Sequence, residues 1–147
     1  MLARREISAA GVRARLQDRG FPADEIESAI ARLVDSGAID DRRVARAYAR
    51  TAVSVNGRGR TRVMRELQQM GISAEIIAQA LGEVFGELDE RTLVARALQK
   101  KLRGRTKPAD PAEQARLYQY LMRQGFSHAA AATALRRLRP GREADEE

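Results

Sequence analysis

One short sequence occurs three times in this chain: Leu16-Gln17-Asp18-Arg19-Gly20-Phe21, then Leu67-Gln68-Gln69-Met70-Gly71-Ile72, then Leu121-Met122-Arg123-Gln124-Gly125-Phe126. The glycines are 51 and then 54 residues apart, and an apolar residue precedes each leucine by four positions. A repeat of this length is typical of a supersecondary unit that is copied along the chain, with neighbouring copies sharing a core. The sequence therefore predicts a row of similar helical modules.

The composition favours helices and a polyanionic partner. Of the 147 residues, 44% are hydrophobic and 4% are aromatic, which fits helices better than a β-sandwich or barrel. The net charge of +7 and the pI of about 10.7 are typical of nucleic-acid binders, although a solvated, arginine-biased surface is the alternative. The chain has no cysteine and no apolar run near the roughly 20 residues of a membrane span. We expect a cytoplasmic protein without a membrane partner.

Helix-start signals and glycine stops predict eight helices and no strand. Serines at Ser8 and Ser73 are expected to cap helices, and Pro22 is expected to open one in its first turn. Carboxylates at Asp40-Asp41 and at Asp89-Glu90 mark two further starts, where they complement the helix dipole.

The repeat groups these helices into modules at residues 1–56, 57–103 and 111–139, the last of which lacks its third helix. Residues 104–110 read as a linker, with an ordered loop as the alternative, and residues 140–147 as a disordered acidic tail. The predicted fold class is all-α, an elongated tandem array of three-helix modules. Such an array suits a protein that binds something long.

The repeat also predicts the core. We expect burial of Val12, Leu16, Ile26, Ile30 and their repeat equivalents, which include Leu67. Phe21 and Phe126 follow the repeat glycine and are expected in the core as well, and Val55 ends the apolar stripe of the third helix.

Basic residues recur at helical spacing, which places several on one face of a helix. The first stripe lies on the predicted third helix, the second at the start of the fourth helix, and the third on the sixth helix and the linker after it. At the start of the fourth helix, glycine N–H groups and the helix dipole would also favour an anion. The candidate contacts are Arg42, Arg46, Arg50, Arg58, Arg62, Arg65, Arg96, Lys100, Arg103 and Lys107. A solvated face explains any one stripe, but stripes on consecutive modules favour a shared nucleic-acid surface.

Tyr120 is the aromatic candidate for this surface. It aligns with Arg15 and Glu66 of the earlier repeats, at a position that should face water. It is therefore a candidate to stack on a base, with packing against the linker as the alternative. Because a single aromatic is weak support for a stacking platform, backbone electrostatics must supply most of any affinity.

The sequence offers no catalytic constellation. The single histidine, His128, stands at a polar helix start, and Asp40 and Asp41 point about 100° apart on a helix, so they cannot converge on a substrate. Residues 57–61 lack the Gly-Lys-[Ser/Thr] ending of a phosphate-binding loop. We expect no catalytic residue, no metal site and no cofactor.

Longer motifs surround the repeat: Leu2-Ala3-Arg4-Arg5-Glu6 with Ser8, then Leu33-x-x-x-Gly37-x-Ile39-Asp40-Asp41-x-x-x-Ala45, then Gly59-x-x-Arg62-Val63-x-x-Glu66-Leu67-x-x-x-Gly71-Ile72. On these motifs the chain resembles the RecX family, small modulators of the bacterial RecA recombinase, from residue 2 to about residue 138. It departs from the family pattern at Val44, where an aromatic residue is usual.

This resemblance implies a non-enzymatic protein of tandem three-helix units that lies along the groove of the RecA–single-stranded-DNA filament. Such proteins suppress strand exchange, ATP hydrolysis and coprotease activity. The implied partner is the RecA–single-stranded-DNA filament. From the basic stripes we expect single-stranded DNA to be bound non-specifically and in a salt-dependent way, and we expect a monomer. Two alternatives stay open: a helix-turn-helix DNA-binding protein, which the acidic helix starts at Asp24 and Glu75 disfavour, and a helical adaptor that binds only proteins.

Overall fold

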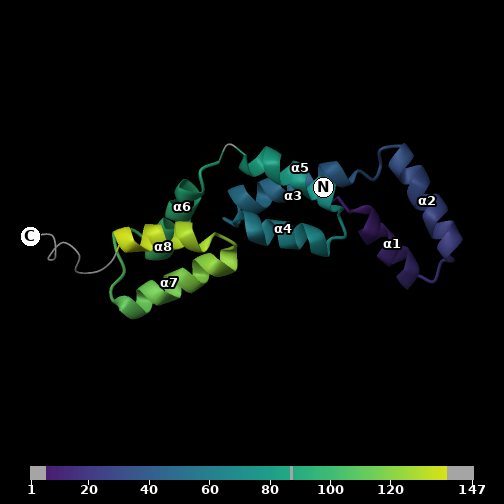
Figure 1. Cartoon of the computed structure of the whole chain (residues 1–147). Helices are drawn as coiled ribbons and strands as arrows, with labels where there is room; N and C mark the ends of the chain where they lie inside the picture. The colour runs from purple at the N-terminus through teal and green to yellow at the C-terminus, as the bar shows by residue number, and fades with distance from the viewer. Residues whose placement is uncertain (1–5, 87, 139–147) are drawn as a thin grey trace, which may run out of the picture. The chain divides into compact units, whose positions relative to one another are not determined.

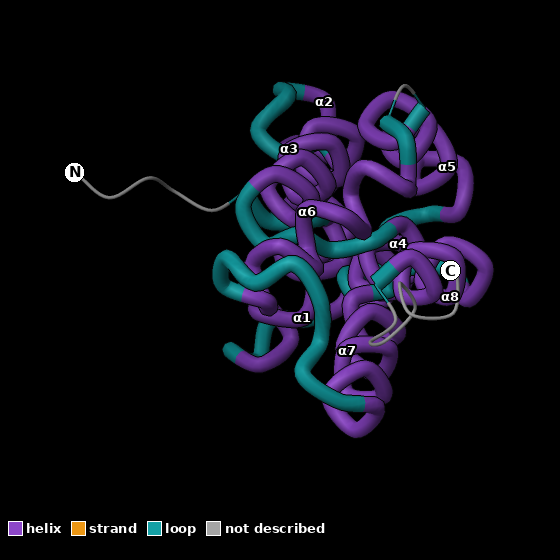
Figure 2. Tube along the Cα trace, turned by 90° about the vertical axis from the view of Figure 1, so that its left-hand side faces the viewer, coloured by secondary structure: helices purple, strands orange, loops and turns teal. Residues whose placement is uncertain are grey.

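The structure, a computed structural model, describes residues 6–86 and 88–138, and these ranges contain helices, turns and loops but no strand (Figure 2). The helices, labelled in Figure 1, are α1 (Ala9–Asp18), α2 (Ala23–Asp35), α3 (Asp41–Ser54), α4 (Arg60–Gln69), α5 (Ala74–Phe85), α6 (Glu90–Leu102), α7 (Pro111–Gln124) and α8 (His128–Arg137). The predicted all-α fold class is confirmed. The acidic tail expected at residues 140–147 lies outside the described residues.

Side-chain caps define where most of the helices begin. In six of them, a side-chain oxygen of the preceding residue accepts a first-turn N–H that has no partner within the helix; in α3 this residue is Asp40, which accepts the Arg42 N–H at 3.0 Å. The other capping residues are Ser8, Ser73, Asp89, Asp110 and Ser127. Pro22 is the N-cap of α2 rather than its first helical residue, one position away from the prediction.

The three repeat glycines have left-handed backbone conformations. Their φ angles are +85° at Gly20, +77° at Gly71 and +97° at Gly125. Only glycine adopts this conformation without a steric penalty, so each one ends a helix and turns the chain towards the next. This requirement explains why the repeat keeps a glycine at this position.

The chain divides into two compact units. The first contains residues 1–51 and 64–86, and the second contains residues 52–63 and 87–147. The division passes through α3 and α4, so the end of α3 and the start of α4 belong to the second unit together with α6, α7 and α8.

In the first unit, apolar faces of α2 to α5 supply the core. The buried side chains include Ile26, Ile30, Val44, Leu67, Ile77, Leu81 and Phe85. The α1–α2 pair is tied by the Arg13 guanidinium, which donates to both carboxylate oxygens of Glu27 at 2.7 and 3.0 Å. This ion pair is exposed and contributes little beyond fixing the angle of the pair.

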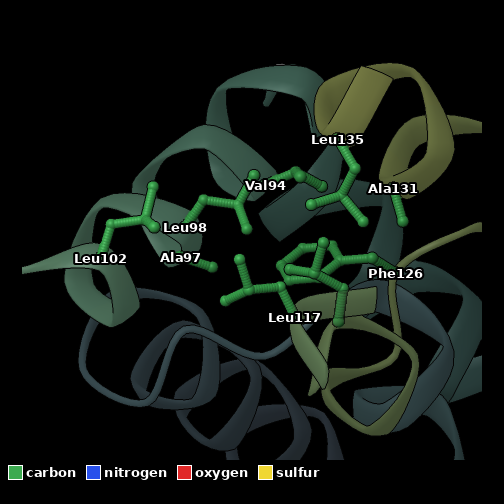
Figure 3. Packing of buried hydrophobic residues seen from close by; sticks show 9 residues of the cluster. Val94, Ala97, Leu98, Leu102, Leu117, Phe126, Ala131 and Leu135 are labelled. Carbon is green, nitrogen blue, oxygen red and sulfur yellow. The ribbon is translucent and has the colours of Figure 1, made fainter. Parts of the chain in front are cut away.

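In the second unit, α6, α7 and α8 enclose one apolar cluster (Figure 3). Its buried members are Val94, Ala97, Leu98, Leu102, Leu117, Leu121, Phe126, Ala131 and Leu135. The predicted burial of Phe126 and Leu121 is thereby confirmed. Glu90 at the start of α6 binds the cap of α8, because its two carboxylate oxygens accept the Ser127 N–H and Oγ–H, each at 2.9 Å.

Each unit contains one copy of the same repeat joint. In the first, Ser8 Oγ donates to the Met70 carbonyl at 2.8 Å, and in the second, the Gly59 N–H donates to the Gln124 carbonyl at 2.7 Å. Ser8 and Gly59 occupy equivalent positions, as do Met70 and Gln124, because each pair has the same offset from its repeat glycine. The start of one repeat therefore packs on the end of the next repeat's first helix in both places.

The predicted core is only partly correct in the first repeat, where Ile26 and Ile30 are buried as expected. Val12 and Leu16 are half-buried and Phe21 is 51% exposed, whereas their equivalents Leu67 and Phe126 are buried. The physical reason is that α6 packs on both α7 and α8, whereas α1 and α2 pack mainly on each other. Val55 is predicted to belong to the apolar stripe of the third helix, but its side chain is 65% exposed. The reason is that α3 ends at Ser54, so Val55 lies outside the helix and its apolar face.

The segment before α7 is an ordered loop in this structure. Arg105 forms an ion pair with Glu113, whose carboxylate also accepts the Ala109 N–H at 2.6 Å. The bonds from Arg105 and from Ala109 hold the pKa of Glu113 at about 2, well below its usual range. Pro108, which belongs to this loop, is buried.

Candidate nucleic-acid interface

The second unit has a shallow cleft lined by basic residues from three elements. The turn after α3 contributes Arg58, α6 contributes Arg96 and Lys100, and α7 contributes Tyr120. Of the described residues that line the cleft, none is acidic. The structure thus brings together four predicted contacts that are far apart in the sequence.

The size of this cleft suits surface contact rather than enclosure of a small molecule. Its volume is about 40 Å³, far below the roughly 300–1,000 Å³ of small-molecule pockets. Cationic side chains around such a depression fit the spaced charges of a phosphate backbone, which needs contact along a surface.

Tyr120 is half-buried at this cleft, so the prediction that it faces water is only partly correct. The Lys101 ammonium lies 4.4 Å from the centre of its ring, a cation–π contact. Helical spacing could not single out Lys101, because it neighbours Lys100 and belongs to no stripe with a period of four. The contact adds a fourth cation beside Arg58, Arg96 and Lys100.

The first basic stripe makes contacts within its own unit. The Arg42 guanidinium donates to Gln79 Oε1 of α5, and Arg46 lies 3.5 Å from the Glu83 carboxylate of α5. Arg42 and Arg50 are exposed, and Arg46 is half-buried. Arg42 and Arg46 therefore connect α3 to α5.

The start of α4 is not an anion site of the predicted kind. The Gly57, Arg58, Gly59 and Thr61 N–H groups donate to the carbonyls of Val53, Ala52, Gln124 and Gly125 respectively. The prediction of free glycine N–H groups is therefore wrong: the Gly57 N–H donates to the end of α3 and the Gly59 N–H donates to the end of α7. A Cβ on Gly125 would lie 2.4 Å from the Arg62 nitrogen, so glycine is required for this approach.

The remaining predicted contacts are distributed over both units. Arg62 is half-buried, and its guanidinium donates to the Arg123 carbonyl at 3.3 Å, which gives it a structural role in the joint. Arg65 is exposed on α4. Arg103 is an exposed C-cap of α6 with φ +53°, and Lys107 is half-buried in the loop before α7. None of these four lines the cleft.

No feature of the described residues forms an enzyme-like centre. His128 Nδ1 lies 2.7 Å from the Tyr118 hydroxyl, and the two rings meet edge to face. Within residues 6–86 and 88–138, no three side chains of metal-ligating type converge. None of the helices in these ranges combines the length and apolar character that crossing a membrane requires.

This arrangement defines a class of protein: consecutive three-helix domains that present basic side chains without a catalytic constellation among the described residues. Family models assign the domains. Residues 1–33 match the first three-helix domain of RecX, residues 40–81 match the second and residues 89–142 match the third. The chain belongs to the RecX family.

The matched domains group the helices differently from the sequence repeat. The second contains α3, α4 and α5, and the third contains α6, α7 and α8. The family domains therefore begin one helix earlier than the predicted modules, and the third domain has three helices.

Similar proteins carry the name Regulatory protein RecX. The chain is 34% identical to that of Geobacillus kaustophilus over 91% of its own length but spans only 49% of that relative. Against the relative of Haemophilus influenzae it is 31% identical, covering 86% of this chain and 82% of the other. The relative of Halorhodospira halophila is 33% identical, with 91% and 83% covered.

Two solved RecX structures have the same fold. The crystal structure of RecX from Lactobacillus salivarius superposes with a TM-score of 0.72 at 24% identity, covering 90% of this chain and 86% of the other. A second crystal structure of regulatory protein RecX gives a TM-score of 0.73 at 23% identity, covering 88% and 64%.

Proposed function

We propose that this chain is a modulator, mainly an inhibitor, of the RecA recombinase. It binds along the RecA–single-stranded-DNA filament as a monomer and suppresses strand exchange, ATP hydrolysis and coprotease activity without catalysing a reaction itself. Membership of a family of regulatory proteins supports the regulatory role. The observation that carries the DNA contact is the basic cleft formed by Arg58, Arg96, Lys100 and Tyr120.

Electrostatics support contact with the phosphate backbone. Each cation that neutralises a phosphate releases counterions, so affinity for DNA falls with salt in proportion to the number of contacts. The Tyr120 ring, which already contacts Lys101, adds a surface against which a base can stack. This mode is sequence-tolerant, as a protein that coats single-stranded DNA at any sequence requires.

The regulatory role is tested by ATP hydrolysis of the cognate recombinase on single-stranded DNA, with and without the chain. We expect a concentration-dependent fall in hydrolysis. An unchanged rate at saturating chain would contradict the proposal.

The DNA contact is tested by titrating single-stranded DNA at two ionic strengths. Each phosphate contact on single-stranded DNA contributes about 0.7 to the steepness of log affinity against log salt. Replacing Arg58, Arg96 and Lys100 by alanine removes three such contacts and should make the slope shallower by about 2. The matched control removes three exposed arginines of the α1–α2 pair, Arg15, Arg19 and Arg32, and leaves the cleft intact. Equal effects of the two variants would show that only net charge matters, and absence of salt-dependent binding would favour the protein-only adaptor.

A further inference from the structure

A second depression of the second unit is larger and mainly apolar. It has a volume of about 560 Å³ and lies between α6, α8 and the loop at residues 104–106. Its apolar lining comes from Ala95, Leu98, Leu102, Ala130, Ala134 and Leu138. Arg91, Arg105 and Arg137 also line it; Arg91 pairs with Asp89 at 3.5 Å and Arg105 pairs with Glu113, and of its described lining residues none is acidic. We call this depression the α6–α8 groove.

The same groove exists one repeat earlier, between α3 and α5 of the first unit. There it is lined by Arg42, Arg46, Ile76, Gln79, Ala80 and Glu83, with a volume of about 170 Å³. Asp89 follows Asp40 by 49 residues, and Gly125 follows Gly71 by 54, which sets the correspondence of α3 with α6 and of α5 with α8. The six lining residues then correspond to Arg91, Ala95, Ala130, Thr133, Ala134 and Arg137, all of which line the α6–α8 groove.

The two grooves differ in what bridges them. In the first unit, the Arg46–Glu83 ion pair and the Arg42–Gln79 hydrogen bond cross from α3 to α5. In the second unit, Ala95 stands in place of Arg46, and Arg137 stands in place of Glu83. The bridge is thereby lost, the groove is more than three times larger, and the Arg137 guanidinium lies where the first unit has a carboxylate.

We infer that the α6–α8 groove binds an acidic segment of a protein partner in which carboxylates alternate with aliphatic side chains. Aliphatic side chains fill the apolar floor, and a carboxylate pairs with Arg137 and Arg91, which replaces the bridge that the first unit builds from its own residues. A phosphate backbone does not suit an apolar floor. A second copy of the chain is disfavoured by its net charge of +7, which opposes self-association.

The inference goes beyond the proposed function, since it concerns a different surface, and its test does not use the recombinase. The probe is a fluorescein-labelled peptide, Glu-Leu-Ala-Glu-Leu-Leu-Glu, titrated with the full chain and followed by fluorescence anisotropy. Control peptides carry glutamine in place of glutamate, or alanine in place of leucine. We expect saturable binding of the probe and weaker binding of both control peptides.

The decisive variant closes the groove as the first unit does. Ala95→Arg with Arg137→Glu installs the equivalent of the Arg46–Glu83 pair at two exposed positions, so the buried core is untouched. The matched control, Ala31→Arg with Arg32→Glu, makes the same residue changes at exposed positions on α2. Binding of the probe should weaken about tenfold or more in the closing variant and stay unchanged in the control.

Three results would overturn the inference. One is that the full chain fails to bind the probe. Another is that the closing variant binds it as well as the unaltered chain. The third concerns the chain's own acidic end: if the probe binds only after Glu143, Asp145, Glu146 and Glu147 are replaced by their amides, that end competes for the groove and no partner segment is required. Amide shifts at Ala95, Thr133 and Arg137 on addition of the probe would place the bound peptide in the groove.

Discussion

At the residue scale, glycines of the repeat serve two physical purposes that can be separated. Gly20 and Gly71 both have left-handed φ angles, but a Cβ on Gly71 would lie 2.4 Å from the Ala10 Cβ, whereas nothing lies within 4 Å of one on Gly20. Gly20→Ala should therefore cost about 1–2 kcal/mol of stability from backbone strain alone. Gly71→Ala should cost about 1–3 kcal/mol more, because the added methyl overpacks the joint.

Urea denaturation followed by circular dichroism measures both glycine variants. Both glycines belong to the first unit, so the same unfolding transition reports on each. Equal losses for the two variants would mean that the Ala10 contact relaxes without cost, and that the joint does not depend on the glycine.

Leucines of the repeat allow a second comparison at this scale. Leu67 is completely buried and Leu16, its equivalent, is half-buried. Leu67→Ala should destabilise the first unit by about 2–5 kcal/mol, the range for a buried leucine that leaves a cavity. Leu16→Ala should cost clearly less, because its side chain loses less burial. Thermal unfolding of the two variants checks this, and a larger loss for Leu16→Ala would contradict the packing described.

These residues also show what the sequence can and cannot predict. Capping chemistry is local, so Ser8 and Ser73 correctly predicted helix starts. Burial depends on the elements that cover a side chain, so the repeat alone placed Phe21 in the core incorrectly. The cleft was not predictable as a unit, because Arg58, Arg96 and Tyr120 are brought together by packing between helices and not by any spacing along the chain.

At the scale of elements, the loop before α7 should make stability depend on pH. The Glu113 pKa is lowered from 4.5 to about 2, first by the hydrogen bond from Arg105 and then by that from the Ala109 N–H. A lowered pKa means that the folded state favours the carboxylate, so this stabilisation is present above about pH 4.5 and is lost as the pH falls towards 2.

Melting temperature measured between pH 5 and pH 2 tests this loop. Glu113→Gln removes the titrating group but keeps its size, so the unaltered chain should lose stability more steeply with falling pH than the variant does. Glu27→Gln provides the comparison: the hydrogen bond from Arg13 lowers the pKa of Glu27 as well, so this variant should change the pH dependence in the same direction. Parallel curves for Glu113→Gln and the unaltered chain would contradict a linked ionisation.

At the scale of the whole molecule, the order of helices decides where the chain can be cut. The sequence repeat suggests that residues 1–110 form two complete modules, but α6 buries Val94, Leu98 and Leu102 against α7 and α8. A fragment of residues 1–110 should therefore lose the helicity of α6 as well as that of the deleted helices. Hydrogen exchange should show unprotected amides in α6 and protected ones in α5, and protection of α6 in the fragment would refute its dependence on α7 and α8.

If both units contact the filament, each contributes to the chain's affinity for it. Modules tethered in one chain raise each other's effective concentration on a polymer, so contacts by both units multiply in the binding constant. Replacing Arg42, Arg46 and Arg50 by alanine should reduce the salt slope for single-stranded DNA less than the cleft variant does, because Arg42 and Arg46 already bond to α5.

Combining the stripe variant with the cleft variant completes the test. If both units contact the same DNA and act independently, the losses in binding free energy add, and the combined variant is weaker than either alone. Circular dichroism must first show that all three variants keep their helices, since Arg46 also pairs with Glu83. A combined variant no weaker than the cleft variant would confine DNA contact to the second unit, and the first unit would then act on the filament only through protein.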